Sequence, residues 1–525
     1  MKYLLAVVVL SVSIVECVAA GQSVPQGGRL MLASPFADHM VLQRDRPVPV
    51  WGTGTPGEAV SVEFAGQSLT TSVGSDGRWR VDLAPMSACR KGRTLSVCGG
   101  RVATTQPPVV VNDVLVGEVW LCAGQSNMGV PLCGGSPRYR DRQGNLIAQM
   151  THRPMIRYVS TPCGNWDFKE HGRTASPLAW RAAVPTNTMT RSFSAVALYF
   201  AFDVEREIGV PVGLVGVYRG ATGIDCWTPP EGTRSRPDLR DIAEWEPVAK
   251  EDWTKANVKG AINRADQQPA VYWNTVVAPW TPFACRGMLW YQGEHDSGEP
   301  QRYCSKLHAL YDGWRGRFEN RDLRFYFVQL CSWGSNIAPM QEAMAQFERE
   351  CPNAAMAVIN DLGSNADVHP NEKALVGHRL ALHALRRDYG FTDIRDNSPS
   401  VESWRVASNT FEVVLKDCKS LYVYRKDWKF DLPFEVAGAD GVFHPAELLN
   451  LRTTKGYGGK LERKGDLVGE RLLVVGAKDV AHPLHLRYLY CSPWTGYIYN
   501  EVNLPLGAFH LDCDMATSEK RDANR

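Results

Sequence analysis

The sequence predicts an α/β protein in which a central domain with a parallel β-sheet is flanked by two β-rich domains. Two observations lead to this prediction. Between about 116 and 395, apolar strand-like segments alternate with helical patterns, which is typical of βαβ units. On both sides of this region, short alternating segments are separated by glycine-containing turns. The length of 525 residues, with 44% hydrophobic and 22% charged residues, agrees with a globular protein of several domains.

The chain begins with the features of a secretory signal. Lys2 precedes an apolar run from Leu4 to Val15, and small residues at 18–20 offer a cleavage site near Ala20. The apolar run is too short to span a membrane comfortably. We therefore predict a signal peptide over residues 1–20 and a secreted or periplasmic protein without a membrane span.

Charge and cysteine content narrow the class of protein further. The 58 basic and 56 acidic residues give a formal net charge of +2, so nothing indicates binding to nucleic acid or to an anionic membrane.

Removal of Cys17 with the signal leaves an odd number of the 14 cysteines, so at least one is free or pairs with another chain. Because no two cysteines have C-x-x-C spacing, no zinc site is predicted. Cys89 and Cys98 bracket a possible hairpin and are the best candidates for a local disulfide.

The three domains are delimited by changes in this pattern. Residues 21–115 predict an N-terminal β-sandwich-like domain, because strand-like runs are separated by turns such as 54–57. Residues 116–395 predict the α/β domain, with an insertion at about 229–268. Residues 396–525 predict a C-terminal β-rich domain that ends in a disordered tail.

The elements of these domains can be placed in chain order. In the α/β domain, strands are expected at 118–123, 155–160, 212–218, 287–291, 324–330 and 356–361. Helices with one apolar face are expected at 194–209, 302–318 and 371–387. In the C-terminal domain, strands are expected at 411–417, 421–426, 434–438, 471–477 and 484–490, and no long helix is expected.

Four of the expected parallel strands lead into short polar segments. These segments are Gly124–Asn127, Arg219–Thr222, Gln292–Glu294 and Asp367–Pro370. In open parallel sheets, ligands bind outside the carboxyl ends of the strands, where such segments converge. We therefore expect a hydroxyl, bare backbone amides, a side-chain amide, a carboxylate and an imidazole to meet at one edge of the sheet.

This set of groups is the one that acyl transfer needs. Ser126 is a candidate nucleophile and His369 a candidate base, since an imidazole with a near-neutral pKa can take the proton of a hydroxyl. Asp367 is the nearest carboxylate that could orient the imidazole. For the developing oxyanion, the candidate donors are the backbone N–H groups of Ser126 and Gly220 and the side chain of Gln292.

Several segments of the chain carry a further signal when they are taken together. They are VWLCAGQSNM, FSAVALYFA, NTVVAP, GMLWYQGE, DVHP, the N-terminal LASPFADHMVLQRDRPVPVWG, and LRYLY with YNEVNLP near the C-terminus. This ordered set resembles the sialate O-acetylesterase family, whose members are carbohydrate esterases of the SGNH-hydrolase superfamily. The resemblance implies a three-layer α/β/α SGNH-hydrolase-like domain in which Ser126 is the nucleophile and His369 the base. We expect neither a cofactor nor a catalytic metal ion.

The chain departs from the family pattern at two places. The family segment Trp-Gly-Gly-Thr is replaced by Arg219–Thr222, which puts the fit of the substrate in question more than the chemistry. The aspartate lies two rather than three residues before the histidine. Asp361 and Glu294 therefore stay open as alternatives to Asp367 in orienting His369.

The predicted function is that of an exported esterase that removes O-acetyl groups from sugars, with O-acetylated sialic acids favoured by the resemblance. An O-acetylated sugar or glycan is the one partner implied, and the oligomeric state is left open. The alternatives are a deacetylase of xylan or another glycan, and a non-catalytic carbohydrate-binding protein on an esterase scaffold. His482 and His485 are expected on opposite faces of a strand and not as metal ligands. The candidate substrate-binding residues are Gln125, Asn127, Arg219, Trp227 and Glu294.

Overall fold

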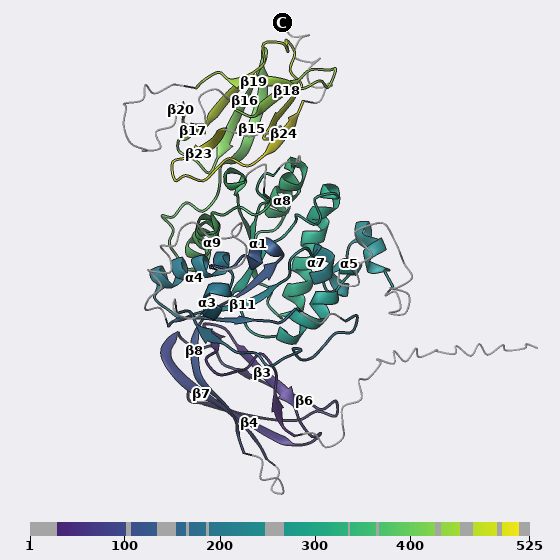
Figure 1. Cartoon of the computed structure of the whole chain (residues 1–525), viewed down its shortest axis with the longest axis vertical. Helices are drawn as coiled ribbons and strands as arrows, with labels where there is room; N and C mark the ends of the chain where they lie inside the picture. Colours follow the sequence, from purple (N-terminus) through teal and green to yellow (C-terminus); the bar gives the residue numbers. More distant parts are fainter. Residues whose placement is uncertain are drawn as a thin grey trace, which may run out of the picture.

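The computed structural model describes residues 29–100, 107–133, 154–163, 167–184, 188–246, 267–333, 337–363, 367–425, 432–451, 466–490 and 496–513. The predicted signal peptide, the middle of the predicted insertion and the predicted tail lie outside these residues. Among the described residues, no helix is both long and apolar enough to cross a membrane. Along the long axis, Figure 1 shows N-terminal strands at one end, a helix-rich region in the middle and C-terminal strands at the other end.

The N-terminal strands form one small sheet and one extension of the large sheet. The small antiparallel sheet contains β1 (Met31–Leu32), β3 (Val48–Thr53) and β6 (Arg78–Leu83). The extension, which joins β8 (Val109–Gly124), contains β2 (Val41–Gln43), β4 (Ala59–Phe64), β5 (Gln67–Ser72) and β7 (Cys89–Gly99). In β4, every second residue is buried, as expected for a strand with one face on a core.

The expected disulfide between Cys89 and Cys98 is wrong. Both thiols are free. The two cysteines lie near opposite ends of the single strand β7 instead of on two arms of a hairpin. An extended chain of this length separates them by about 30 Å, whereas a disulfide needs Cα atoms within roughly 7 Å.

Strand β8 belongs to both the N-terminal and the central part of the molecule. Its first half pairs with β7, and its second half pairs in parallel with β11 (Val212–Tyr218) and β12 (Gly287–Tyr291). It runs through the domain boundary expected between residues 115 and 116. The domain limits therefore stay predictions.

The central part of the large sheet has the strand order β10-β9-β11-β8-β12-β13-β14. From β9 to β14 the paired strands are parallel, and β10 is antiparallel to β9. All residues of β12 and β14 are buried, as expected for a parallel sheet covered on both faces. The bounds not yet given are β9 (Ile156–Ser160), β10 (Arg181–Ala182), β13 (Arg324–Val328) and β14 (Ala354–Ala357).

Four long helices flank this sheet. Helices α4 (Ala195–Ile208) and α9 (Lys373–Asp388) pack so closely that a Cβ added at Gly377 would lie 2.6 Å from the Cβ of Tyr199. Helices α7 (Pro300–Arg317) and α8 (Ala338–Glu350) form a second pair, and Figure 1 shows the two pairs on different sides of the sheet. The shorter helical segments are α1 (Ser126–Gly129), α3 (Thr188–Ser192), η2 (Ile224–Trp227), α5 (Pro230–Arg234), η3 (Pro237–Leu239), α6 (Arg240–Ala243), η7 (Trp273–Val277), η8 (Ala278–Trp280) and η9 (Asn360–Leu362).

The strands expected at 212–218 and 287–291 are confirmed in full, and the three expected helices are found within two residues of their expected ends. The strand expected at 356–361 is wrong in its position. Strand β14 begins and ends earlier, and residues 360–362 form the 3₁₀ turn η9. Helix α8 was not predicted.

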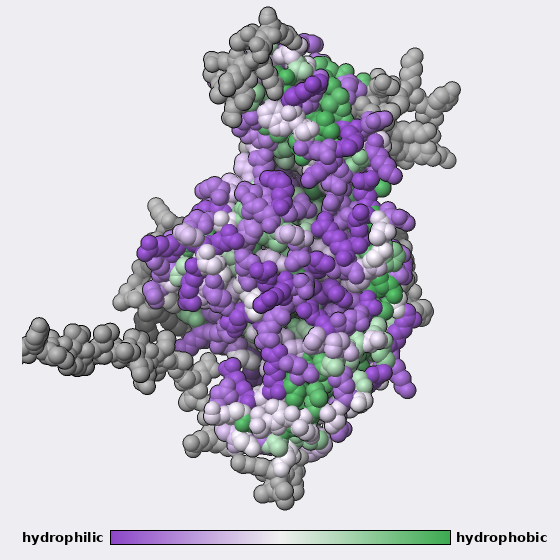
Figure 2. All heavy atoms as spheres, turned by 180° about the vertical axis from the view of Figure 1, so that it is seen from behind, coloured by the Kyte–Doolittle hydropathy of each residue, from purple (hydrophilic) through white to green (hydrophobic). Residues whose placement is uncertain are grey.

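The C-terminal strands form a seven-stranded and a three-stranded antiparallel sheet around a core of their own. They contact the central region through Asn360, whose side chain donates to the carbonyl of Leu506 (2.8 Å), and through Tyr499, whose hydroxyl donates to Asp361 (3.2 Å). Seen from behind, the central region is mainly hydrophilic, and small hydrophobic clusters lie toward the two β-rich ends (Figure 2). The large sheet contains β15 (Ser400–Ala407), β16 (Thr410–Lys416), β21 (Leu472–Gly476), β19 (His444–Leu448), β18 (Phe434–Ala437), β22 (His485–Tyr488) and β24 (Phe509–Asp512), and the small sheet β20 (Asp466–Gly469), β17 (Leu421–Arg425) and β23 (Gly496–Asn500).

Candidate active site

The site begins where β8 ends, at a glycine that the local geometry requires. Gly124 has a φ of +136°, and a Cβ there would lie 2.1 Å from the carbonyl oxygen of Tyr291 on β12. Only glycine fits such a close approach without strain. The next residue, Gln125, donates its backbone N–H to the same carbonyl (3.0 Å), and α1 then starts at Ser126. The turn therefore presents the Ser126 hydroxyl at the carboxyl end of the central strand.

The hydroxyl of Ser126 meets the imidazole of His369 there. Ser126 Oγ lies 2.8 Å from His369 Nε2. On the other side of the ring, Nδ1 lies 3.2 Å from Asp367 Oδ1, and the same carboxylate oxygen accepts the backbone N–H of His369 (2.9 Å). With the proton on Nδ1, the ring donates to the carboxylate and leaves Nε2 to accept from the hydroxyl. This is a continuous relay from hydroxyl to carboxylate.

The electrostatic environment keeps this imidazole neutral. Burial lowers the pKa of His369, and the positive charge of Lys373 lowers it further, against the opposing effect of Asp367. A neutral imidazole is the form that can accept a proton. The relay is therefore in its base-competent state at neutral pH.

A cavity of about 710 Å³ opens beside the relay. This volume lies in the range of sites that hold small ligands, about 300–1,000 Å³. Ser126 and His369 both line it, as do Gln125, Arg219 and Gly220. The further lining residues are Gly129, Val130, Pro131, Thr161, Cys163, Tyr218, Ala221 and Val368.

Comparisons with known proteins agree with this geometry. A family profile described as carbohydrate esterase, sialic acid-specific acetylesterase, matches residues 116–386, which is more than half of the chain. The chain belongs to this carbohydrate esterase family. It is 26% identical to the sialate O-acetylesterase of Rattus norvegicus over 449 residues, which cover 76% of this chain and 80% of that protein. It is 25% identical to the sialate O-acetylesterase of Homo sapiens over 439 residues, which cover 77% and 79%.

A solved structure supports the same assignment. The crystal structure of a carbohydrate acetylesterase from Xanthomonas citri superimposes with a TM-score of 0.75 at 27% identity, covering 92% of this chain and all of that one. The protein is therefore a carboxylic ester hydrolase, and the resemblance seen in the sequence is confirmed.

In this esterase, Gln292 is not placed as the third oxyanion donor that the sequence suggested. Its side chain is fully buried, and its amide nitrogen donates to the carbonyl of Thr222 (3.0 Å) and to Asp296 (2.5 Å). Both amide hydrogens are therefore used, and Tyr303 donates to its oxygen (2.8 Å). Gly220 lies beside Ser126, since a Cβ added to it would be 3.6 Å from the Cβ of Ser126.

The structure separates the three carboxylates proposed for orienting His369. Asp367 is hydrogen-bonded to the ring. Asp361 instead forms a bidentate pair with Arg379 (2.7 and 2.8 Å). Glu294 accepts a hydrogen bond from the side chain of Asn127, and burial raises its pKa.

Two of the expected substrate-binding residues are buried in the esterase and do not line the cavity. Asn127 is fully buried and bonded to its neighbours. Trp227 is also fully buried, stacks on Tyr272 with ring centroids 5.1 Å apart, and donates its indole N–H to Thr222 (2.9 Å). Glu294 is likewise absent from the cavity lining among the described residues. Of the five candidates, Gln125 and Arg219 line it.

Sequence reasoning missed a buried lysine beneath the histidine loop. Lys373 donates to Asn127 Oδ1 (2.5 Å), and Asn127 donates to Glu294 and to the carbonyl of Val368 (3.0 Å), the residue before His369. Burial lowers the pKa of Lys373 to about 8. This buried chain connects α1 to the histidine loop. No sequence signal pointed to it, because lysines are almost always exposed.

Proposed function

We propose that this esterase removes O-acetyl groups from sugars through a covalent acyl-enzyme on Ser126, and that its natural substrates are O-acetylated sialic acids. The observation that carries the mechanism is the hydrogen bond of 2.8 Å between Ser126 Oγ and His369 Nε2 at the wall of the cavity. Family membership and the curated relatives support the chemical class of the substrate.

In the first step, Ser126 Oγ attacks the carbonyl carbon of the acetyl group while its proton passes to His369 Nε2. Asp367 holds the ring through Nδ1 and stabilises its positive charge. The carbonyl oxygen becomes an oxyanion, for which the backbone N–H groups of Ser126 and Gly220 are the candidate donors. Collapse of this intermediate breaks the bond to the sugar oxygen, which takes the proton from His369 and leaves as a free hydroxyl.

In the second step, water repeats the sequence on the acetyl-enzyme. His369 accepts a proton from the water, the hydroxide attacks the acetyl carbon, and Ser126 leaves with the proton. Acetate is released and the serine is restored. No atom or electron is needed beyond substrate and water.

Arg219 supports an acidic sugar as substrate. It is exposed, and among the described residues that line the cavity it is the one with a permanent charge. Sialic acids carry a carboxylate, whereas acetylated xylose is neutral. A guanidinium binds a carboxylate with two parallel hydrogen bonds. Arg219 therefore favours binding of an acidic sugar over a neutral one.

The mechanism is tested with 4-nitrophenyl acetate. We expect Ser126→Ala to lower kcat by at least about 10³-fold, because the covalent step is lost. The variant should keep the circular dichroism spectrum and Tm of the wild type. Hydrolysis that survives at the wild-type rate would rule out Ser126 as the nucleophile.

The substrate class is tested with Arg219→Ala. We expect kcat/KM for O-acetylated sialic acid to fall by about tenfold or more, and kcat/KM for acetylated xylose to change little. Arg219→Lys, which keeps the charge but not the planar fork, should fall in between. Faster release of acetate from acetylated xylan than from mucin, with no effect of Arg219→Ala, would favour the xylan alternative.

We also infer that the central region is an SGNH-type α/β/α domain and that the mature protein is exported. The parallel sheet with helix pairs on different sides supports the first inference. The apolar segment at residues 4–15 supports the second. Mass spectrometry of the protein from the culture medium, with a new N-terminus near Gly21, would test export.

A further inference from the structure

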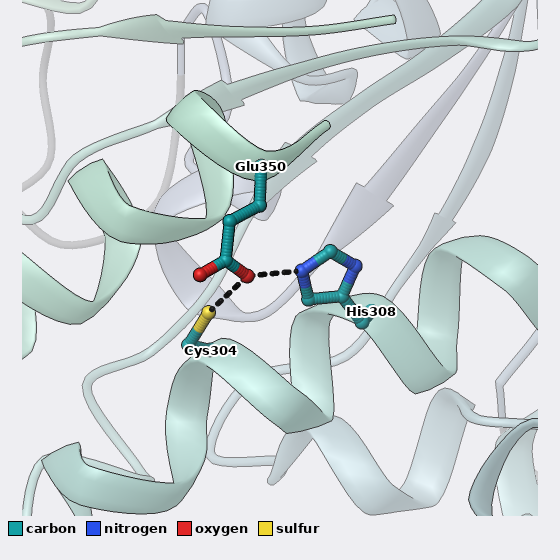
Figure 3. A group of neighbouring side chains, drawn as sticks. All are labelled: Cys304, His308 and Glu350. Carbon is teal, nitrogen blue, oxygen red and sulfur yellow. Dashed lines mark hydrogen bonds and ion pairs between the residues drawn. The ribbon is translucent and has the colours of Figure 1, made fainter. Parts of the chain in front are cut away.

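A second group of reactive side chains lies away from the cavity, between α7 and α8. Cys304 and His308 are four residues apart on α7 and so lie on the same face of the helix. Glu350 is the last residue of α8 and points to both of them (Figure 3). Glu350 Oε2 lies 2.9 Å from His308 Nε2 and 3.6 Å from Cys304 Sγ. The three ligand atoms all lie within 4.8 Å of one another.

The surrounding structure holds these three groups in place. Cys304 is 8% exposed, and the side chains of His308 and Glu350 are 14% and 46% exposed. The imidazole of His308 packs edge-on against the ring of Phe347, with centroids 4.8 Å apart. Gln346 donates to the second oxygen of Glu350 (2.8 Å). The three ligand atoms therefore lie close together in the rotamers that the structure shows.

The geometry argues against a nucleophilic role for this cysteine. Burial raises the pKa of Cys304 to about 12, so the thiol stays protonated at neutral pH. His308 is paired with Glu350 and not aligned as a base for the sulfur. None of the three residues lines the cavity beside Ser126.

A thiolate, an imidazole nitrogen and a carboxylate oxygen form a donor set that suits Zn²⁺. In a tetrahedral zinc site, bonds of 2.0–2.3 Å place neighbouring ligand atoms roughly 3.3–3.7 Å apart. The distances of 2.9 and 3.6 Å lie close to this range. We propose that Cys304, His308 and Glu350 bind one Zn²⁺-like divalent cation, with water as the fourth ligand, and that the cation links α7 to the end of α8.

Binding has a defined proton balance. The cation replaces the proton of the Cys304 thiol, which is released to solvent, and a metal–sulfur bond forms without any change of oxidation state. The site contributes to stability and not to ester hydrolysis. If the protein binds no cation at this site, the proposed esterase function is therefore unaffected.

The described residues contain a second group that serves as an internal control. His485, His510 and Asp512, on β22 and β24, also have ligand atoms within 4.8 Å of one another. Their side chains are 32%, 34% and 57% exposed and include no sulfur. A metal–thiolate signal therefore distinguishes the two groups.

The test is a titration of the full-length mature protein with Co²⁺ under reducing conditions, followed by absorption. We expect the near-ultraviolet charge-transfer band of a cobalt–thiolate bond to saturate at one equivalent, and Zn²⁺ to abolish it by competition. Cys304→Ser should lose the band, and His308→Ala should weaken Co²⁺ binding by at least about tenfold. His485→Ala should keep the band. Zn²⁺ should raise the Tm of the wild type by a few degrees and that of Cys304→Ser by less.

Two results would overturn the proposal. One is a wild-type protein that gives no thiolate band with Co²⁺. The other is a band that persists in Cys304→Ser, since it would come from another cysteine. If Cys304→Ser does not fold, Glu350→Gln with His308→Gln replaces it, and an unchanged affinity for Co²⁺ in that variant would contradict the proposal. Hydrolysis of 4-nitrophenyl acetate at the wild-type rate verifies that each variant is folded.

Discussion

His369 and His308 are each paired with a carboxylate, but the two histidines arrange their partners differently. His369 uses its two ring nitrogens on opposite partners, with Ser126 on Nε2 and Asp367 on Nδ1. At the helix pair, Cys304 and His308 both point to one oxygen of Glu350. The first arrangement is a line along which a proton can move. The second is a cluster of donors that share one centre, which suits a cation.

The difference follows from the elements that carry the residues. At the sheet edge, Ser126 starts α1 directly after β8, and His369 follows β14 and η9, so the two side chains meet in direct contact beside the cavity. On the helices, residues one turn apart lie side by side and point the same way. The residues of the proton relay therefore come from segments that follow strands, whereas the proposed cation ligands come from two packed helices.

The largest expected effect is that esterase activity and Co²⁺ binding can each be removed without the other. Ser126→Ala should lower kcat for 4-nitrophenyl acetate by about 10³-fold or more and leave the Co²⁺–thiolate band intact. Cys304→Ser should do the reverse. If either variant loses both properties while its circular dichroism is unchanged, the two sites are not independent and the comparison fails.

The next effect concerns the carboxylate of the relay. Asp367→Asn should lower kcat/KM by about 10- to 1,000-fold, because the amide no longer stabilises the imidazolium. The lower bound reflects the side chain of Asp367, which is one-third exposed. Asp361→Asn is the matched control: it breaks the pair with Arg379, so it should lower Tm more than it lowers kcat. If Asp361→Asn lowered kcat/KM more than Asp367→Asn does, Asp361 would be the residue that orients His369.

A smaller effect is expected from Lys373 and Lys306, which are buried lysines among the described residues. Lys373 lowers the pKa of His369, so Lys373→Met should raise that pKa and move the acidic limb of kcat/KM to higher pH. Lys306 on α7 is just as buried but is paired with Asp225 and Asp296. Lys306→Met should lower stability, since it leaves buried carboxylates unpaired, and leave the acidic limb in place. A shift of equal size in both variants would show a general effect of charge and not the local one.

Much of the sheet and the centre of the relay could be predicted from the sequence. Strand-like runs that end in polar segments placed Ser126 and His369 at one edge, because the carboxyl ends of parallel strands converge. The position of β14 could not be predicted in the same way. The segment 354–359 is apolar throughout, so its pattern does not show that strand β14 already ends at Ala357, before the 3₁₀ turn η9.

The residues that sequence reasoning misassigned share one cause. Gln292 and Trp227 follow or lie near strand ends, yet each turns inward to satisfy buried partners such as Asp296 and Thr222. Position along the chain does not show the direction of a side chain in a loop. The search for C-x-x-C spacing missed the proposed cation ligands for a related reason. His308 and Glu350 lie on different helices and are 42 residues apart in sequence, so no short motif contains both.

The smallest expected effect comes from an alanine in the loop beside the relay. Ala221 has a φ of +59°, a conformation that costs a residue with a side chain roughly 1–2 kcal/mol. Glycine removes this strain but gains freedom in the unfolded chain, so Ala221→Gly should stabilise the protein by about 0.5–1 kcal/mol. Ala345→Gly, in the middle of the helix that carries Glu350, should destabilise it by about 1 kcal/mol. Urea unfolding with an unchanged m-value measures both. If both variants lose stability, the backbone at Ala221 is not strained. The loop beside the relay and the helix that carries Glu350 would then not differ in backbone strain.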